Sequence, residues 1–424
     1  MKNLHRCALI GLFLGVAPLA ADGPWAPAVF LDPGTVLELT PSAGTQTGNT
    51  IFVGTLFDEA ANSLELGRVN VSTLPPTATF VPIETGSIFA LGGIDQAAGF
   101  VGFSYINPSF DLKFARCAAP CNSVPAVTID SATNWIDSSS AASADDFFVA
   151  GLDDGTDSIK IHYSDDGGAT WHLLNTLTPP NLYVNFNGGK RIGLVVDPAA
   201  TNPATTSNCL LYDTRPTAGT TTLRLNCRNG ASPVFDVAVD SDIPNPLNQF
   251  DRFIETSIAR RSAGPGSRRH IAASKRATQQ VRGMVIDENG LHVSSPIDYG
   301  PVPTGTAFYS IGQTETEAPQ PRNRVFFRSS SALQVKDIEF DPDAPPPMVR
   351  FGPTVETGPL SMFNWSETGN PADAFLFAFA MVSIGALAPE SPNVTGFGVS
   401  WRAVGLFDDS FETQSLTRWS ANVP

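Results

Sequence analysis

Three carboxylates recur at one position of a repeated strand pattern. The third residue of seven short segments reads, in order along the chain, Glu38, Ala90, Asp137, Leu194, Glu255, Ser310 and Asn364. If these segments are neighbouring strands around one channel, Glu38, Asp137 and Glu255 converge at its mouth. Converging carboxylates bind a cation or act as acid and base in glycoside hydrolysis. The alternative is a polar lining of a water-filled channel.

Other sequence patterns give little further chemistry. The acidic run 153–157 could bind calcium, although Asp and Gly are also the usual residues of a hairpin turn. The histidines His162, His172, His270 and His292 form no H-x-x-x-H pair and no cluster with cysteine, so we expect no zinc site. The sequence contains no G-x-S-x-G elbow, phosphate-binding glycine loop or dinucleotide fingerprint. Calcium is therefore the single cofactor that we consider.

The elements that position these residues follow from a phrase that occurs seven times. Each unit opens with a short strand-like run, the first at 36–38 and the last at 362–364, and continues with a second apolar run and a third run of period two. We expect the first two runs to be buried on both faces and the third to be half exposed. A fourth, outer strand then leads into the next unit. This repeat predicts an all-β fold, a single β-propeller with seven four-stranded blades.

The ring closure can be predicted as well. Residues 27–32, Pro-Ala-Val-Phe-Leu-Asp, closely match residues 125–130, Pro-Ala-Val-Thr-Ile-Asp, which form an outer strand. An outer strand that precedes the first inner strand has no blade of its own. We expect it to pair with the last blade, because this closure removes the two open sheet edges.

Four cysteines follow the N-terminal segment, and they predict two disulfides. Cys209 and Cys227 lie at equal distances from a turn near Ala218, which places them opposite each other across a hairpin. Cys117 and Cys121 then close a small loop.

Residues 164–171 read Ser-Asp-Asp-Gly-Gly-Ala-Thr-Trp and fit the pattern S-x-D-x-G-x-T-W. Asp166 can accept backbone N–H groups, Gly168 permits a positive φ, and Trp171 can be buried. Here the chain resembles the Asp-box (BNR) repeat proteins of the sialidase-like β-propeller superfamily. The resemblance implies a structural role, without catalysis, for Ser164, Asp166, Gly168, Thr170 and Trp171.

The chain departs from the sialidases themselves. It lacks their Arg-Ile-Pro or Arg-Leu-Pro motif, and its arginines do not recur at inner-strand positions. Tyr309 and Glu255 faintly resemble the sialidase nucleophile pair, but tyrosine and glutamate are common on inner strands, so we dismiss this resemblance. Sialidases have six blades, and the fourth inner run, 192–194, is the least typical one here, so six blades remain the alternative.

The two ends of the chain lie outside the propeller, which we expect at 22–407. Residues 1–21, with Lys2, Arg6 and the apolar run 8–16, are typical of a secretory signal peptide. No later segment is long and apolar enough to span a membrane. The tail comprises residues 408–424. Residues 407–412, at its start, resemble a C-terminal segment of exported gammaproteobacterial proteins. We therefore expect a secreted or periplasmic bacterial protein.

The charge of the chain limits its partners. A net charge of −15 disfavours nucleic acid and anionic membrane surfaces. One basic cluster, in the fifth unit, indicates either a solvated face or a docking site for an acidic glycan or protein; it consists of Arg252, Arg260, Arg261, Arg268, Arg269, Lys275, Arg276 and Arg282. The sequence predicts an exported binding or scaffold propeller whose ligand is unknown. The alternative is a glycan-active hydrolase that is not a true sialidase and that uses Glu38, Asp137 and Glu255.

Overall fold

The computed structural model describes the backbone of 29 strands and most side chains between residues 49 and 238. The described residues are 29–32, 36–40, 46–47, 49–57, 62–131, 134–182, 192–197, 200–217, 220–244, 256–260, 269–275, 280–286, 291, 297–301, 309–314, 322–327, 334–341, 348–356, 365–370, 375–383 and 395–403. The predicted signal peptide and C-terminal tail lie outside these ranges.

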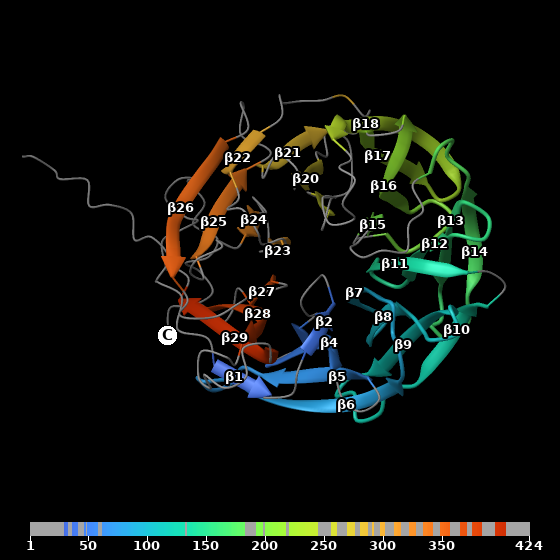
Figure 1. The fold of residues 1–424 in the computed structure, drawn as a ribbon. Coiled ribbons are helices and arrows are strands. Elements are labelled where there is room, and N and C mark those ends of the chain that lie inside the picture. Colours follow the sequence, from blue (N-terminus) through green and yellow to red (C-terminus); the bar gives the residue numbers. More distant parts are fainter. Residues whose placement is uncertain are drawn as a thin grey trace, which may run out of the picture.

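The strands form seven antiparallel sheets, the number that the repeats predicted, and the sheets are arranged as blades in a ring (Figure 1). Blades 1 and 2 contain β2 (Val36–Leu39), β3 (Gln46–Thr47), β4 (Thr50–Phe57), β5 (Ser63–Asn70), β6 (Thr77–Thr85), and β7 (Ala90–Ala97), β8 (Phe100–Ile106), β9 (Leu112–Ala118), β10 (Ala126–Asp130). Blades 3 and 4 contain β11 (Trp135–Ala142), β12 (Phe147–Asp153), β13 (Ser158–Ser164), β14 (His172–Leu177), and β15 (Ile192–Val196), β16 (Ser207–Thr217), β17 (Thr220–Asn229), β18 (Ser232–Pro244).

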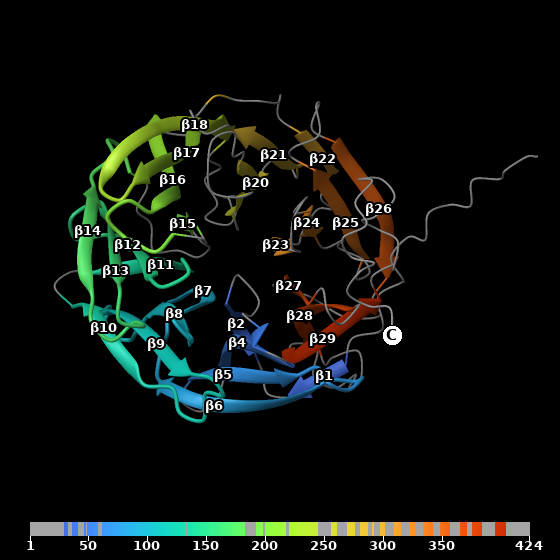
Figure 2. The ribbon, with the colours of Figure 1, turned by 180° about the vertical axis from the view of Figure 1, so that it is seen from behind.

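The second half of the ring repeats this order. Blades 5 and 6 contain β19 (Thr256–Arg260), β20 (Arg269–Lys275), β21 (Gln280–Ile286), β22 (Ile297–Pro301), and β23 (Tyr309–Thr314), β24 (Arg322–Phe327), β25 (Gln334–Asp341), β26 (Met348–Glu356). Blade 7 contains β27 (Trp365–Asn370), β28 (Phe375–Ser383) and β29 (Thr395–Ala403). In both views of the ring, first strands such as β7 and β11 lie toward the centre and fourth strands such as β18 and β26 lie at the rim (Figures 1 and 2). The predicted all-β propeller is confirmed.

The N-terminal strand closes the ring. β1 (Val29–Asp32) pairs antiparallel with β29 and becomes the fourth, outer strand of blade 7, with Val29 opposite Val399. Figure 2 shows β1 beside β29, the two ends of the described chain meeting in one sheet. The predicted closure is confirmed, and it pairs the strand edge that β29 would otherwise expose.

The hydrophobic core lies between successive blades. Phe52 and Leu64 of blade 1 pack in one cluster with Phe103 of blade 2. Phe114 of blade 2 packs in the next cluster with Phe147 of blade 3. Blades 2 and 3 thus bury both faces, which explains the continuous apolar runs of their second strands.

The prediction for the third strand of each blade was wrong in one respect. β5, β9 and β13 are mostly buried, whereas β6, β10 and β14 carry the half-exposed and exposed positions. The third strand has a neighbouring strand on each edge and a blade against each face. Solvent therefore reaches chiefly the fourth strand.

None of the segments that the structure describes forms a long apolar helix of the kind that spans a bilayer.

Candidate functional site

Among the three predicted channel carboxylates, Asp137 is the one whose side chain is described. It lies in β11 with 4% of its surface exposed. Its Oδ1 accepts the N–H of Ser138 at 2.8 Å, and its Oδ2 accepts the N–H of Ile192, in β15 of blade 4, at 3.1 Å. Asp137 therefore links two blades. Glu38 lies in β2 with its side chain outside the description, and Glu255 lies outside the described residues, so the convergence of the three carboxylates stays a prediction.

Short polar side chains also join the first two strands of blade 2 to the inner strand of blade 3. The Ser104 hydroxyl lies 3.1 Å from the hydroxyls of Ser138 and Ser140, and the Ser104 N–H donates to Ser140 Oγ at 3.0 Å. Ser140 Oγ in turn donates to the carbonyl of Gly93. We call Ser104, Ser138 and Ser140 the serine seam. It is buried, so its hydrogen bonds replace those that water would make.

Two further side chains extend this blade-to-blade hydrogen bonding. Asp95 Oδ2 accepts the N–H of Ala142 at 2.7 Å, from blade 2 to blade 3. Ser139 Oγ accepts the N–H of Leu194 at 3.0 Å, from blade 3 to blade 4. Polar residues of these strands therefore link blades 2, 3 and 4.

The turn at residues 164–171 is organised around one carboxylate. Asp166 Oδ1 accepts the N–H groups of Ala169 at 2.8 Å and Thr170 at 2.9 Å, and its Oδ2 accepts the Thr170 hydroxyl at 2.7 Å. Ser164 Oγ donates to Asp166 at 2.8 Å and accepts the N–H of Gly168 at the same distance. Burial acts to raise the pKa of Asp166, but these hydrogen bonds outweigh it and hold the pKa well below its ordinary value.

The same turn docks on the neighbouring blade. Gly167 and Gly168 have φ values of 69° and 86°, which other residues rarely adopt. Arg116, from β9 of blade 2, donates from Nη1 to the carbonyl of Gly167 at 2.8 Å and to that of Asp166 at 3.3 Å. The half-buried Trp171 ring packs edge-on against Phe114 at 4.8 Å, also in blade 2. This tryptophan is thus partly buried, and it packs at the boundary between two blades.

Replacing Asp166 by alanine is expected to destabilise the protein by about 1–2 kcal/mol, because several turn donors lose their acceptor. Urea unfolding at pH 7 measures this difference. The adjacent, exposed Asp165 is the control, and we expect Asp165→Ala to stay within about 0.5 kcal/mol of the parent. Equal unfolding midpoints for the two variants would contradict the assigned role of Asp166.

The buried carboxylate of the acidic turn 153–157 accepts hydrogen bonds from within the turn. Asp153 Oδ1 accepts the N–H of Gly155 at 2.9 Å, and Oδ2 accepts the hydroxyl of Thr156 at 2.5 Å. Lys160 Nζ lies 3.7 Å from the same oxygen. Across the described residues, no group of three or more His, Cys, Asp or Glu side chains is placed to hold a metal ion. Within the described residues, no cluster of ligands supports calcium binding at this turn.

The buried His162 lies beside the partly exposed Asp130 and Lys160, between blades 2 and 3. Its Nε2 is 3.9 Å from Asp130 Oδ2 of β10, and Lys160 Nζ is 3.5 Å from the same atom. His162 Nδ1 is buried and has no hydrogen-bond partner among the described residues, and the Trp135 ring lies 6.2 Å from the imidazole. Burial lowers the pKa of His162 to about 4, opposed by the charge of Asp130 and reinforced by Lys160.

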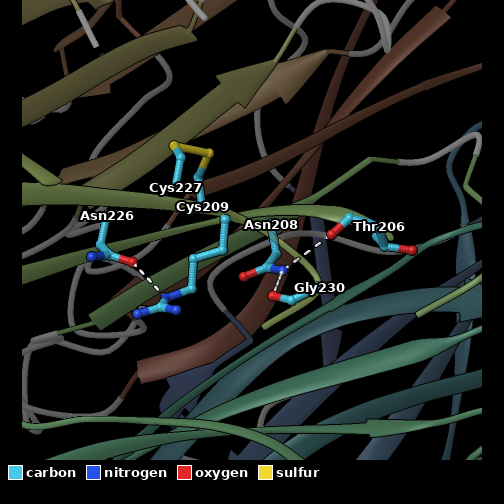
Figure 3. The surroundings of a disulfide bond; sticks show 7 residues. Thr206, Asn208, Cys209, Asn226, Cys227 and Gly230 are labelled. Atoms are coloured by element: carbon cyan, nitrogen blue, oxygen red, sulfur yellow. Dashed lines mark hydrogen bonds between the residues drawn. A yellow bond between two sulfur atoms is a disulfide. The ribbon is translucent and has the colours of Figure 1, made fainter. Parts of the chain in front are cut away.

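Both disulfides are the predicted pairs, Cys117–Cys121 and Cys209–Cys227. Cys209 and Cys227 are cross-strand partners in β16 and β17. Figure 3 shows Asn208 beside this bond, its amide donating to the carbonyls of Thr206 at 3.2 Å and Gly230 at 3.1 Å. These contacts join the start of β16 to the end of β17, next to the disulfide.

A pocket of about 310 Å³ lies on the outer part of blade 2, next to the docked turn. The Cys117 end of β9 and the connection from Ala118 to Pro125 form it, together with Phe100 and Arg116. Sequence reasoning did not identify this pocket. The signal in the sequence was the short Cys117–Cys121 loop, which constrains this connection.

The basic cluster of blade 5 is described through its backbone. Arg260 of β19 pairs with Arg269 of β20, and Arg282 of β21 pairs with Ala273 of β20. Lys275 ends β20. The remaining members lie outside the described residues; they are Arg252, Arg261, Arg268 and Arg276. Of the other histidines, His172 lies in β14, His270 in β20, and His292 outside the description.

The fold defines the chain as a closed β-propeller. The sequence matches no family model and no curated protein. Among solved structures, it is similar to the WD40 domain of Toxoplasma gondii coronin, with 9% identity over 92% of this chain and 90% of that one and a TM-score of 0.48. It is also similar to the β-propeller domain of the Trilobed protease from Pyrococcus furiosus, with 9% identity, 83% and 92% coverage and a TM-score of 0.45.

A further similarity is to the subtype N11 neuraminidase-like protein of a flat-faced bat isolate, with 9% identity over 91% of this chain and 95% of that one and a TM-score of 0.41. Similarities at this level carry no inference about ligand or activity. The propeller assignment rests on the strand pairing of the chain itself.

Proposed function

We propose that this chain is an exported β-propeller that binds a glycan or protein ligand and does not hydrolyse glycosidic bonds at its channel mouth. The observation that carries the proposal is the hydrogen bonding of the Asp137 carboxylate. Both of its carboxylate oxygens accept backbone N–H groups, one of them from the next blade. A glycosidase acid or nucleophile must instead present its carboxyl group to the sugar.

The exported location is part of this proposal. Two disulfides are typical of proteins that fold in an oxidising compartment. The N-terminal residues 1–21 read as a signal peptide. We also assign residues 164–171 to the Asp-box class, supported by the hydrogen bonds that Asp166 accepts within the turn and by the docking of the turn on blade 2.

The test is a glycan array probed with the purified mature protein, beside a screen of chromogenic glycosides. We expect retention of the protein by a subset of glycans and no release of chromophore. The rival function is a hydrolase that uses Glu38, Asp137 and Glu255. Turnover that disappears in a folded Asp137→Asn variant would establish the hydrolase and overturn the proposal.

A further inference from the structure

The pocket on blade 2 has walls that are held in place. Cys117 and Cys121 are joined by a disulfide, and the Cys121 N–H donates to the carbonyl of Ala118 at 2.8 Å. The Arg116 N–H donates to the carbonyl of Pro125 at 3.0 Å, which ties the far end of the connection to β9. Ligand pockets usually measure about 300–1,000 Å³, so this volume suits one compact group.

The amide of Asn122, which lines this pocket, has a fixed orientation. Arg68 of blade 1 donates from Nη1 to Asn122 Oδ1 at 3.1 Å. Because a guanidinium has donors and no acceptor, the atom it contacts must be the amide oxygen. The Nδ2 group of Asn122 then carries two N–H donors, and no protein group in the described part of the chain accepts them.

Arg116 supplies the positive charge of the pocket. Its guanidinium lies over the Phe100 ring, 5.1 Å from the centroid, and its Nη1 binds the carbonyls of the docked turn. These contacts hold the side chain while, within the described residues, its Nε and Nη2 have no hydrogen-bond partner in the protein. A guanidinium held in this way pairs best with a carboxylate.

The described lining residues of the pocket include no carboxylate. In the docked turn, Asp166 already accepts the hydrogen bonds of Thr170, Ala169 and Ser164. Donors therefore outnumber acceptors among Arg116, Asn122 and Ser123. A ligand for this pocket must bring acceptor oxygens and negative charge.

We propose that this pocket binds the carboxylate of an acidic sugar, with Arg116 and Asn122 as donors to the carboxylate and Ser123 as a partner for a ring hydroxyl. This inference deepens the proposed function, on which it rests, by assigning a site and a ligand chemistry. The pocket is separate from the channel-mouth position of Asp137, since it lies on the third strand and the outer connection of blade 2.

Asn122→Asp is the sharpest test variant. The substituted side chain has the same shape and keeps an oxygen for Arg68, but it replaces the two N–H donors with a second, negatively charged oxygen. Asn122 is exposed, so the change leaves the fold intact. The matched control is Asn202→Asp, an identical change at an exposed turn residue ahead of β16, in blade 4.

The experiment is isothermal titration calorimetry of the mature protein with sodium glucuronate, glucose and N-acetylglutamate. We expect glucuronate to bind at least about tenfold more tightly than either of the others, and Asn122→Asp to weaken it about tenfold, while Asn202→Asp leaves it unchanged. No glucuronate binding, equal binding of glucose or N-acetylglutamate, or an unaffected Asn122→Asp variant would overturn the assignment.

The two proposals fail in different ways. If the glycan array finds ligands whose binding Asn122→Asp does not change, the binding role stands and this site is wrong. If the chromogenic screen finds turnover that depends on Asp137, the proposed function is wrong, while the calorimetry still reports on the pocket.

Discussion

Replacing Gly92 by alanine is expected to destabilise the protein by about 3 kcal/mol, although it adds a single methyl group. Gly92 and Gly93 form a bulge in β7, where the pairing with β8 shifts. A Cβ atom on Gly92 would lie 2.0 Å from Ser104 Oγ and 2.6 Å from Ser140 Oγ. Both hydroxyls belong to the buried serine seam, so they cannot move without breaking hydrogen bonds between blades 2 and 3.

A double variant separates this steric cause from a general loss of stability. Ser104→Ala removes the atom that the new Cβ would meet first. We expect Gly92→Ala combined with Ser104→Ala to be more stable than Gly92→Ala alone, a non-additive result that urea unfolding measures. The control is Gly99→Ala, since a Cβ there meets nothing within 4 Å and the cost reduces to about 1–2 kcal/mol for its positive φ. Additive effects of the Gly92 and Ser104 substitutions would contradict the close contact.

Stability is expected to fall by about 3 kcal/mol between pH 6.5 and pH 4 on account of His162. Its folded-state pKa of about 4 lies below its unfolded value, so the unfolded chain binds the extra proton in this range. The contribution of His162 to the free energy of unfolding is therefore complete above pH 6.5 and is lost as the pH falls toward 4. The groups that face the His162 imidazole are Asp130 from β10, Lys160 from β13 and Trp135 from β11.

The measurement is the urea unfolding free energy at several pH values between 7.5 and 4 for the parent and for His162→Gln. We expect the variant to lose most of the pH dependence in this range. His172→Gln is the matched control, because His172 is exposed on β14. A His162→Gln variant with the parent's pH dependence would show that other groups cause it.

The sequence sufficed for the features that depend on strand order. Two cysteines at equal distances from one turn must meet across the hairpin, and Cys209 and Cys227 are direct cross-strand partners. The match between residues 27–32 and an outer strand predicted the closure, because an outer strand without a blade has one open edge to join. Such relations follow from the spacing and the similarity of segments within the chain.

Contacts between neighbouring blades could not be predicted in this way. The pattern placed Asp137 on an inner strand, but its partner Ile192 belongs to the next sheet, and no spacing rule relates their positions. The Gly92–Gly93 pair and the three consecutive serines at 138–140 were the available signals. Glycine inside a strand marks a bulge or a close approach, but it does not say what approaches. Arg116 likewise reads as one surface arginine until the turn of blade 3 is seen to dock on it.

A crystal structure of the mature protein soaked with sodium glucuronate tests the central claim most directly, because it shows both the ring and the location of the ligand. We predict seven blades closed by the strand at residues 29–32, with glucuronate at Arg116 and Asn122 on blade 2. Asp137 should still bind the N–H of Ile192. Glucuronate bound instead at a channel mouth formed by Glu38, Asp137 and Glu255 would contradict the account.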